Sequence, residues 1–333
     1  MVRYGWGMIE TAVHSEDPAS IEATMRSELA LGDSSVEGVV PILRHLLASD
    51  GNALFSEEIV ARVRGMAKAI VAQLLETATT GEGETHEGAA SDAQALDEAA
   101  RIAVTDALVN NTAFLRHIHA LALEWQLTDR LQSRLGVDPV VSPLLQSQIA
   151  SSDAGISTLA MKLLASQARF CQAQRRMSHS VLELPRNLFD SVIAAAKEAA
   201  PLSGANTLPE TIASLQASYD EAATRLGLIS TLLGAMGGEA ASALSVVHSG
   251  PAIFLSAMAQ GAGLGRDASV LATNEAQCAR LALALRAAGL KPAGIEEQFV
   301  ALHPDVTLPE GFERLNADRA AALLAVAGDR HGA

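Results

Sequence analysis

Apolar residues recur at alternating three- and four-residue steps along residues 208–236, a spacing that places side chains on one face of an α-helix. This stripe is formed by Ile212, Leu215, Tyr219, Ala222, Leu226, Ile229, Leu233 and Met236. A helix of this length spans on the order of 40 Å and needs an equally long apolar partner. The sequence therefore predicts one long helix over 208–236, against which the rest of the chain packs.

Three further regions carry the same helical spacing, and they predict core helices near 101–135, 153–177 and 267–289. Asn111 lies inside the apolar stripe of the first region. Two interpretations stay open there: an Asn in a seam between helices can fix their register, or Asn110-Asn111 ends one helix and starts another. β-branched and aromatic residues do not alternate as strands require. We predict an all-α fold of stacked antiparallel helical hairpins, as a multi-helix bundle or a short α-superhelix.

One segment, residues 77–93, is acidic, polar and rich in glycine, and it cannot bury enough apolar surface to offset the entropy cost of ordering. We predict a flexible loop or linker there, between an N-terminal helical subdomain (1–76) and a main helical domain (94–333). Residues 41–76 and 143–177 both place a proline-led short helix before a longer one. A duplicated helical hairpin and a chance similarity both explain this echo, and no named repeat signature matches.

Composition narrows the range of partners. The 333 residues carry a formal net charge of -14, and 49% are hydrophobic although only 3% are aromatic. A negative field repels phosphate backbones and anionic lipids, so we expect neither nucleic acid nor membrane as a partner. No uninterrupted apolar run of about 18 residues predicts a membrane span, and the N-terminus lacks the pattern of a signal peptide. We therefore expect a cytoplasmic protein, with Cys171 and Cys278 as buried, reduced thiols.

The sharpest chemical feature is a basic cluster near the end of the helix predicted over 153–177. Arg169, Arg175 and Arg176 lie within eight residues of one another, and His179 follows. Because an arginine offers a planar fork of donors to oxyanions, these four residues predict a binding site for an acidic partner, a phosphate or the chain's own acidic loop. The alternative is a solvated helix end, where arginine complements the helix dipole.

His117 and Glu124 are a weaker candidate, for a ligand pocket, because residues seven apart share a helix face. His119 points about 200° away from His117, so one helix cannot bring both imidazoles to one metal ion. The glycines of 261–265 lack the spacing of a phosphate-binding loop, and no Gly-x-Ser-x-Gly elbow occurs. We predict no metal, no cofactor and no catalytic residue.

These observations favour a non-enzymatic interaction module, an adaptor or regulator that binds another protein through a helical groove and the Arg-rich patch. The alternative is an enzyme or small-ligand binder with an apolar pocket between helices. A protein partner is expected, and so is self-association, since an apolar stripe without a partner would be an exposed patch.

Overall fold

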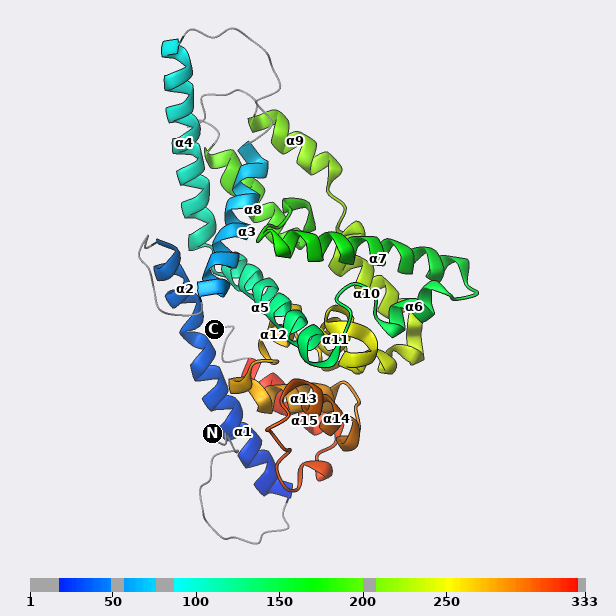
Figure 1. Ribbon diagram of the computed structural model, residues 1–333. Coiled ribbons are helices and arrows are strands. Elements are labelled where there is room, and N and C mark those ends of the chain that lie inside the picture. The colour runs from blue at the N-terminus through cyan, green and yellow to red at the C-terminus, as the bar shows by residue number, and fades with distance from the viewer. Residues whose placement is uncertain (1–17, 49–56, 76–86, 200–207, 329–333) are drawn as a thin grey trace. The chain divides into compact units, whose positions relative to one another are not determined.

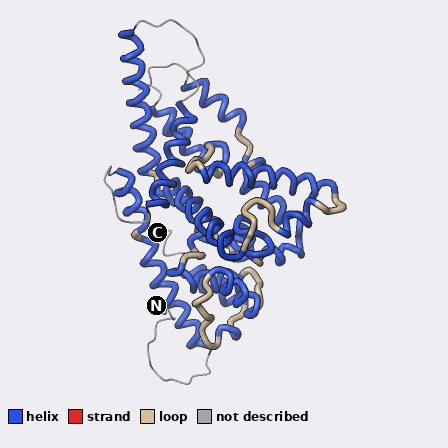
Figure 2. The backbone as a smooth tube through the Cα atoms, in the orientation of Figure 1, coloured by secondary structure: helices blue, strands red, loops and turns tan. Residues whose placement is uncertain are grey.

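The structure is a computed structural model that describes residues 18–48, 57–75, 87–199 and 208–328. Throughout these ranges the regular elements are helices, and no strand is present in them (Figures 1 and 2). The all-α fold class is therefore confirmed. The finer arrangement as stacked antiparallel hairpins stays a prediction.

The chain forms two compact units, each assembled from separate stretches. Unit 1 contains Met1–Val39, Leu123–Leu164 and Ile229–Ala333, and unit 2 contains Val40–Ala122 and Ala165–Leu228. The sequence instead predicts contiguous domains, 1–76 and 94–333, and that division stays a prediction. Helices α5 (Thr112–Leu135), α7 (Ala154–Arg175) and α10 (Arg225–Met236) each divide between the units, so their parts are described with the unit to which they belong; α2 (Val39–Ala48) has only its first residue, Val39, in unit 1 and is described with unit 2.

Unit 1 is organised around a buried helix, α11. Besides its parts of α5, α7 and α10, the unit holds α1 (Pro18–Glu37), α6 (Pro143–Ile149), η5 (Gly237–Leu244), α11 (Val246–Ala262), α12 (Arg266–Leu271), η6 (Glu275–Gln277), α13 (Cys278–Ala287), α14 (Pro292–Leu302), η7 (Phe312–Arg314) and α15 (Ala317–Gly328). Residues 249–259 of α11 are all buried, and this helix packs on α6, η5 and α12–α14. Because these elements cover residues 249–259, this part of α11 needs no face of polar residues towards solvent.

Unit 2 is a group of helices around α3 and α8. Its elements besides the divided helices are α2 (Val39–Ala48), α3 (Glu57–Leu75), α4 (Glu87–Asn110), η2 (Val181–Glu183), α8 (Arg186–Ala199), α9 (Leu208–Ser218) and η4 (Glu221–Ala223). Helix α3 packs against α4 and α9, and α8 packs against the same two helices (Figure 1). The inward face of α3 is formed by Ile59, Val63, Met66, Ile70 and Leu74, all buried. Their helical spacing explains why this segment is helical and which face it buries.

The predicted continuous helix over 208–236 is wrong, because the chain breaks between α9 and α10. Asp220 has extended backbone angles and its carboxylate accepts from Ala222 N at 3.0 Å, while Thr224 Oγ1 accepts from Gly227 N at 3.1 Å. Each side chain acts as a helix N-cap, which starts a new helix instead of continuing the old one. Tyr219 fixes the break: it is buried, its ring stacks on Phe189 at 4.0 Å, and its hydroxyl donates to Leu184 O at 2.8 Å.

The structure also tests two other predictions about the core helices, the boundary at Asn111 and the single helix near 267–289. The interpretation of Asn111 as a helix boundary is confirmed: α4 ends at Asn110, α5 begins at Thr112, and Asn111 Oδ1 accepts from Phe114 N at 3.0 Å. The single helix predicted near 267–289 is wrong, since α12, η6 and α13 occupy it. Asn274 caps η6 by accepting from Ala276 N at 3.0 Å. A side-chain N-cap therefore divides this segment, as the caps at Asp220 and Thr224 divide residues 208–236.

The predicted linker over 77–93 is only partly within the described residues. Positions 76–86 lie outside them, whereas residues 87–93 form the first turns of α4, so the prediction of a loop is wrong for this portion. The physical reason is local composition. Alanine has the highest helix propensity and an acidic residue is favourable at a helix N-terminus, and this portion is alanine-rich and starts with Glu87.

Candidate functional site

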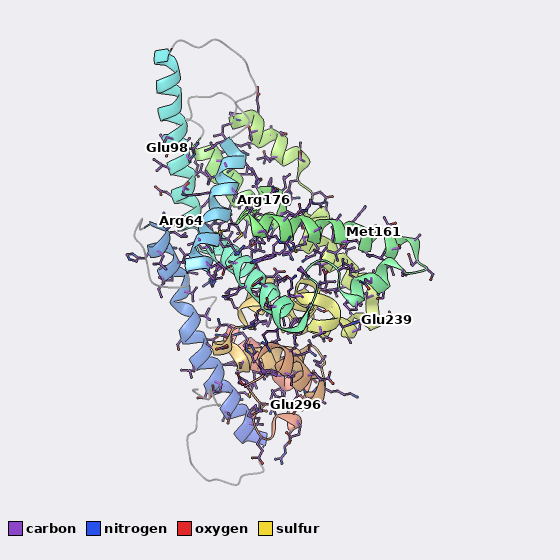
Figure 3. The ribbon with its side chains drawn as sticks, viewed as in Figure 1. Arg64, Glu98, Met161, Arg176, Glu239 and Glu296 are labelled. Atoms are coloured by element: carbon purple, nitrogen blue, oxygen red, sulfur yellow. The ribbon has the colours of Figure 1, made fainter. Side chains whose placement is uncertain are left out.

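The Arg-rich patch, defined as Arg169, Arg175 and Arg176, lies at the end of α7 in unit 2. All three residues are exposed, and Figure 3 shows Arg176 at the end of the helix. Arg169 lies in α7 and Arg176 directly follows its last residue, with Arg176 N still donating to Gln172 O at 3.3 Å and to Ala173 O at 3.0 Å. Helical spacing therefore places the two arginines on one side, about 10 Å apart along the axis. Among the described residues, no hydrogen bond or ion pair engages any of the three guanidinium groups. The patch therefore presents three exposed cations that no described carboxylate compensates.

Helix α7 ends at a left-handed residue that is not glycine. Met177 has φ 52°, and Ser178 N donates to Ala173 O at 2.9 Å across it. This bond satisfies a carbonyl of the last helical turn in the manner of a Schellman cap, where glycine usually takes the left-handed position. For a residue with a side chain that conformation costs about 1–2 kcal/mol, so the surroundings of Met177 must hold it.

Helix α3 supplies the groups that hold this end of α7. The buried Arg62 donates to Gln174 O and forms an ion pair with Glu58 at 2.8 Å. Gly65 lies against Met177, since a Cβ added to Gly65 would stand 2.9 Å from Met177 Cβ. The close approach requires glycine at position 65. The guanidinium of Arg62 donates a hydrogen bond to a carbonyl that the end of α7 would otherwise leave without a partner.

The loop after α7 is bound to α3 by one glutamine. Gln73 Nε2 donates to His179 O at 3.1 Å, and Gln73 Oε1 accepts from Val181 N at 3.0 Å and from Ser180 Oγ at 3.2 Å. The ring of His179 is buried beside His117, with ring centroids 6.4 Å apart and an interplanar angle of 65°. The structure thus brings together two predicted site residues, but it places His179 in the interior of unit 2 and not in the exposed patch.

Glu124 lies in unit 1 and has a charge partner there. It is 1% exposed, and its carboxylate forms an ion pair with Arg266 at 3.0 Å. Arg266 Nε also donates to Ser256 Oγ at 3.0 Å. A buried carboxylate needs such a partner, because an isolated buried charge is costly. The ion pair supports a structural role for Glu124. His117, with which Glu124 is predicted from the sequence to line a ligand pocket, belongs to unit 2.

Several residues that shape this region are not apparent from sequence patterns. Arg225 is buried, with its guanidinium 3.6 Å from the ring centre of Phe170 and with a hydrogen bond to Gln167 Oε1 at 3.3 Å. The stacking and the hydrogen bond together offset part of the cost of burying this cation. For Arg62, Gln73 and Arg225 the sequence offers no local signal. For Gly65 it does, because a glycine inside a helical pattern indicates a close packing contact.

The pKa values of His303, which is buried, and of Cys278, which is half-buried, are shifted from their ordinary values. Burial and the nearby Arg130 lower the pKa of His303 to about 4, although Glu275 opposes the shift. Burial, with Glu275 and Glu28, raises the pKa of Cys278 to about 11. At neutral pH the imidazole is therefore uncharged and the thiol stays protonated, which makes Cys278 a poor nucleophile.

Within the described ranges, no three His, Cys, Asp or Glu side chains gather in a way that could hold a metal ion. No helix of the described part of the chain combines the length and apolar character that crossing a bilayer requires. Comparison with protein-family models, with curated proteins and with solved structures gave no match for this chain. Any functional interpretation therefore depends on the residues described above.

Proposed function

We propose that this chain is a non-enzymatic interaction module that binds another protein through the Arg-rich patch on α7. The observation that carries the proposal is the exposure of Arg169, Arg175 and Arg176, which no described carboxylate compensates. Free guanidinium groups offer paired donors to the carboxylates of a partner. The participation of a helical groove and the cytoplasmic location stay predictions.

A role of these arginines at the helix end is the competing explanation, and the position of Arg62 weakens it. The cation that reaches a carbonyl of the last turn of α7 is Arg62, which comes from α3 and is buried. The end of a helix needs donors for its last carbonyl groups, and Arg62 already donates to one of them. Arg175 and Arg176 are therefore not needed to complete the end of the helix, which supports a role outside the fold.

The experiment compares two double charge reversals in the full chain. In the first variant, Arg175 and Arg176 are both replaced by Glu. In the second, the control, Arg116 and Lys197 are both replaced by Glu. Arg116 and Lys197 are also exposed and in unit 2, and no hydrogen bond or ion pair engages them among the described residues. Both variants change the net charge equally, so only the position of the change differs.

Each protein serves as bait in extracts of its native host, and captured proteins are quantified by mass spectrometry. We expect at least one protein that wild type and the Arg116/Lys197 variant capture equally to be lost from the Arg175/Arg176 variant. Circular dichroism checks that both variants keep the helix content of wild type. If all captured proteins are retained by the Arg175/Arg176 variant, the proposal is wrong.

A further inference from the structure

We infer that the segment which binds the Arg-rich patch is a carboxylate-rich helix of the partner protein, lying along the end of α7. This inference rests on the proposed function and adds the chemistry and shape of the partner. Its starting point is the side of α7 that carries Arg169 and Arg176, with Gln172 between them, where all three residues are exposed.

The spacing of the arginines matches a second helix. Arg169 and Arg176 are two helical turns apart, about 10 Å along the axis. Two carboxylates seven residues apart on a helix have the same separation, so a helix aligned with α7 could present one carboxylate to each guanidinium. Each such pair forms two parallel N–H···O bonds, which fix the orientation of the partner as well as adding affinity.

The residues around the arginines favour a polar partner face. Gln172 lies between Arg169 and Arg176, and the exposed residue one turn before Arg169 is Ala165. A small residue lets a helix approach closely, and an amide can donate to or accept from side chains of the partner. Binding at this surface would depend on charge pairing more than on burial of large apolar side chains.

The charge of the whole chain disfavours larger polyanions. At a net charge of -14 the chain repels duplex nucleic acid, which carries one negative charge per about 1.7 Å of its axis, and it repels anionic bilayers in the same way. A short acidic helix brings only a few charges to one place. Three local arginines can outweigh the diffuse repulsion for such a segment but not for an extended polyanion.

The patch is also held in place before any partner arrives. Arg62 binds Gln174 O, Gly65 packs against Met177 and Gln73 holds the loop that follows, so α3 fixes the backbone around Arg175 and Arg176. On the side of this chain, binding then requires ordering of the arginine side chains but no rearrangement of the backbone, which lowers the cost of association.

The test uses a fluorescein-labelled helical peptide of about 20 residues with Glu at every seventh position, titrated with the full chain and followed by anisotropy. A second peptide has the same composition, but its Glu positions are distributed around the helix. We expect the first peptide to bind at least tenfold more tightly than the second. Replacing Arg169 and Arg176 by Glu should weaken its binding at least tenfold, whereas the Arg116/Lys197 variant should stay within twofold of wild type.

The conservative variant R169K/R176K gives an independent measure, because lysine keeps the charge but loses the bidentate geometry. We expect an intermediate loss, about threefold to tenfold. Equal binding of the two peptides, or equal losses in the patch and control variants, would overturn the inference. So would patch-dependent binding of inorganic phosphate, a DNA duplex or phosphatidylserine vesicles that is tighter than binding of the peptide.

Failure of this inference can be told apart from failure of the proposed function. If capture of a host protein depends on Arg175 and Arg176 but the acidic helix does not bind, the function stands and the chemistry of the partner is wrong. If the acidic helix binds through the patch but no host protein depends on it, the proposed function is wrong.

Discussion

At the scale of single residues, Gly65 has a clear structural requirement, because the carbonyl of Met177 and its Cβ occupy the space where a side chain would begin. Replacing Gly65 by Ala should lower the free energy of unfolding by about 1–3 kcal/mol, since either α3 or the end of α7 must shift. Urea denaturation measures this loss. Gly234, in α10, is the matched control, because a Cβ there meets nothing within 4 Å. Gly234→Ala should leave stability unchanged or raise it by up to about 1 kcal/mol; similar losses in both variants would contradict the close approach at Gly65.

The lowered pKa of His303 predicts how the free energy of unfolding depends on pH. Its pKa in the folded chain is lowered to about 4 by burial and by Arg130, with Arg134 acting in the same direction and Glu275 against it. Between about pH 4 and the ordinary histidine pKa of about 6.5, the unfolded chain binds a proton at this site that the folded chain does not. The contribution of His303 to stability is therefore present above about pH 6.5 and decreases as the pH falls towards 4, by about 3 kcal/mol in all.

The variant His303→Gln isolates this contribution, because glutamine does not titrate. The difference in unfolding free energy between wild type and variant, measured in urea at several pH values, should vary across this window and be constant above it. A difference independent of pH between 4 and 6.5 would show that His303 titrates normally in the folded chain.

At the scale of elements, the boundary between α4 and α5 depends on one cap. Asn111 Oδ1 accepts from Phe114 N at 3.0 Å, whereas the side-chain amide of the exposed Asn110 donates to Asp106 O at 2.9 Å within its own helix. Asn111→Ala should cost about 1 kcal/mol of stability in urea denaturation, and Asn110→Ala less than about 0.5 kcal/mol. In a continuous helix the outcome would be reversed, because replacing a seam Asn by Ala removes a buried polar group and raises helix propensity. A stabilising Asn111→Ala would therefore contradict the boundary.

Helical periodicity predicts which faces are buried better than it predicts where helices stop. Tyr219 and Ile229 belong to the apolar stripe predicted from the sequence, and both are buried, yet the chain between them is not one helix. Asp220 and Thr224 carry the signal that was available, since both residue types favour N-caps. The break also shifts the buried face, because Ala222 of the predicted stripe is exposed whereas Arg225, which is not in the stripe, is buried.

In the candidate site, too, features formed by residues close together in the sequence could be predicted, whereas contacts between residues far apart in the sequence could not. The Arg-rich patch is visible in the sequence because its members lie within eight residues. The contacts of Arg62 and Gln73 with the end of α7 join residues more than a hundred positions apart, and no local pattern encodes them. Such contacts follow from how the helices pack, and they also explain why His179 is buried although it lies only three residues after Arg176.

At the scale of the whole molecule, the net charge of -14 and the three arginines of the patch act over different distances, and salt separates them. At an ionic strength of about 0.01 M the screening length is about 30 Å, so an acidic peptide feels the repulsion of the whole chain. At about 0.15 M the screening length is about 8 Å, and the nearby guanidinium groups dominate. We therefore expect the affinity for the acidic helix to rise between these concentrations and to fall above about 0.3 M, where the local ion pairs are screened as well. Anisotropy titrations across this range measure the dependence. A monotonic fall from the lowest salt would mean that the diffuse charge of the chain does not reach the patch, and the argument against extended polyanions would then lose its basis.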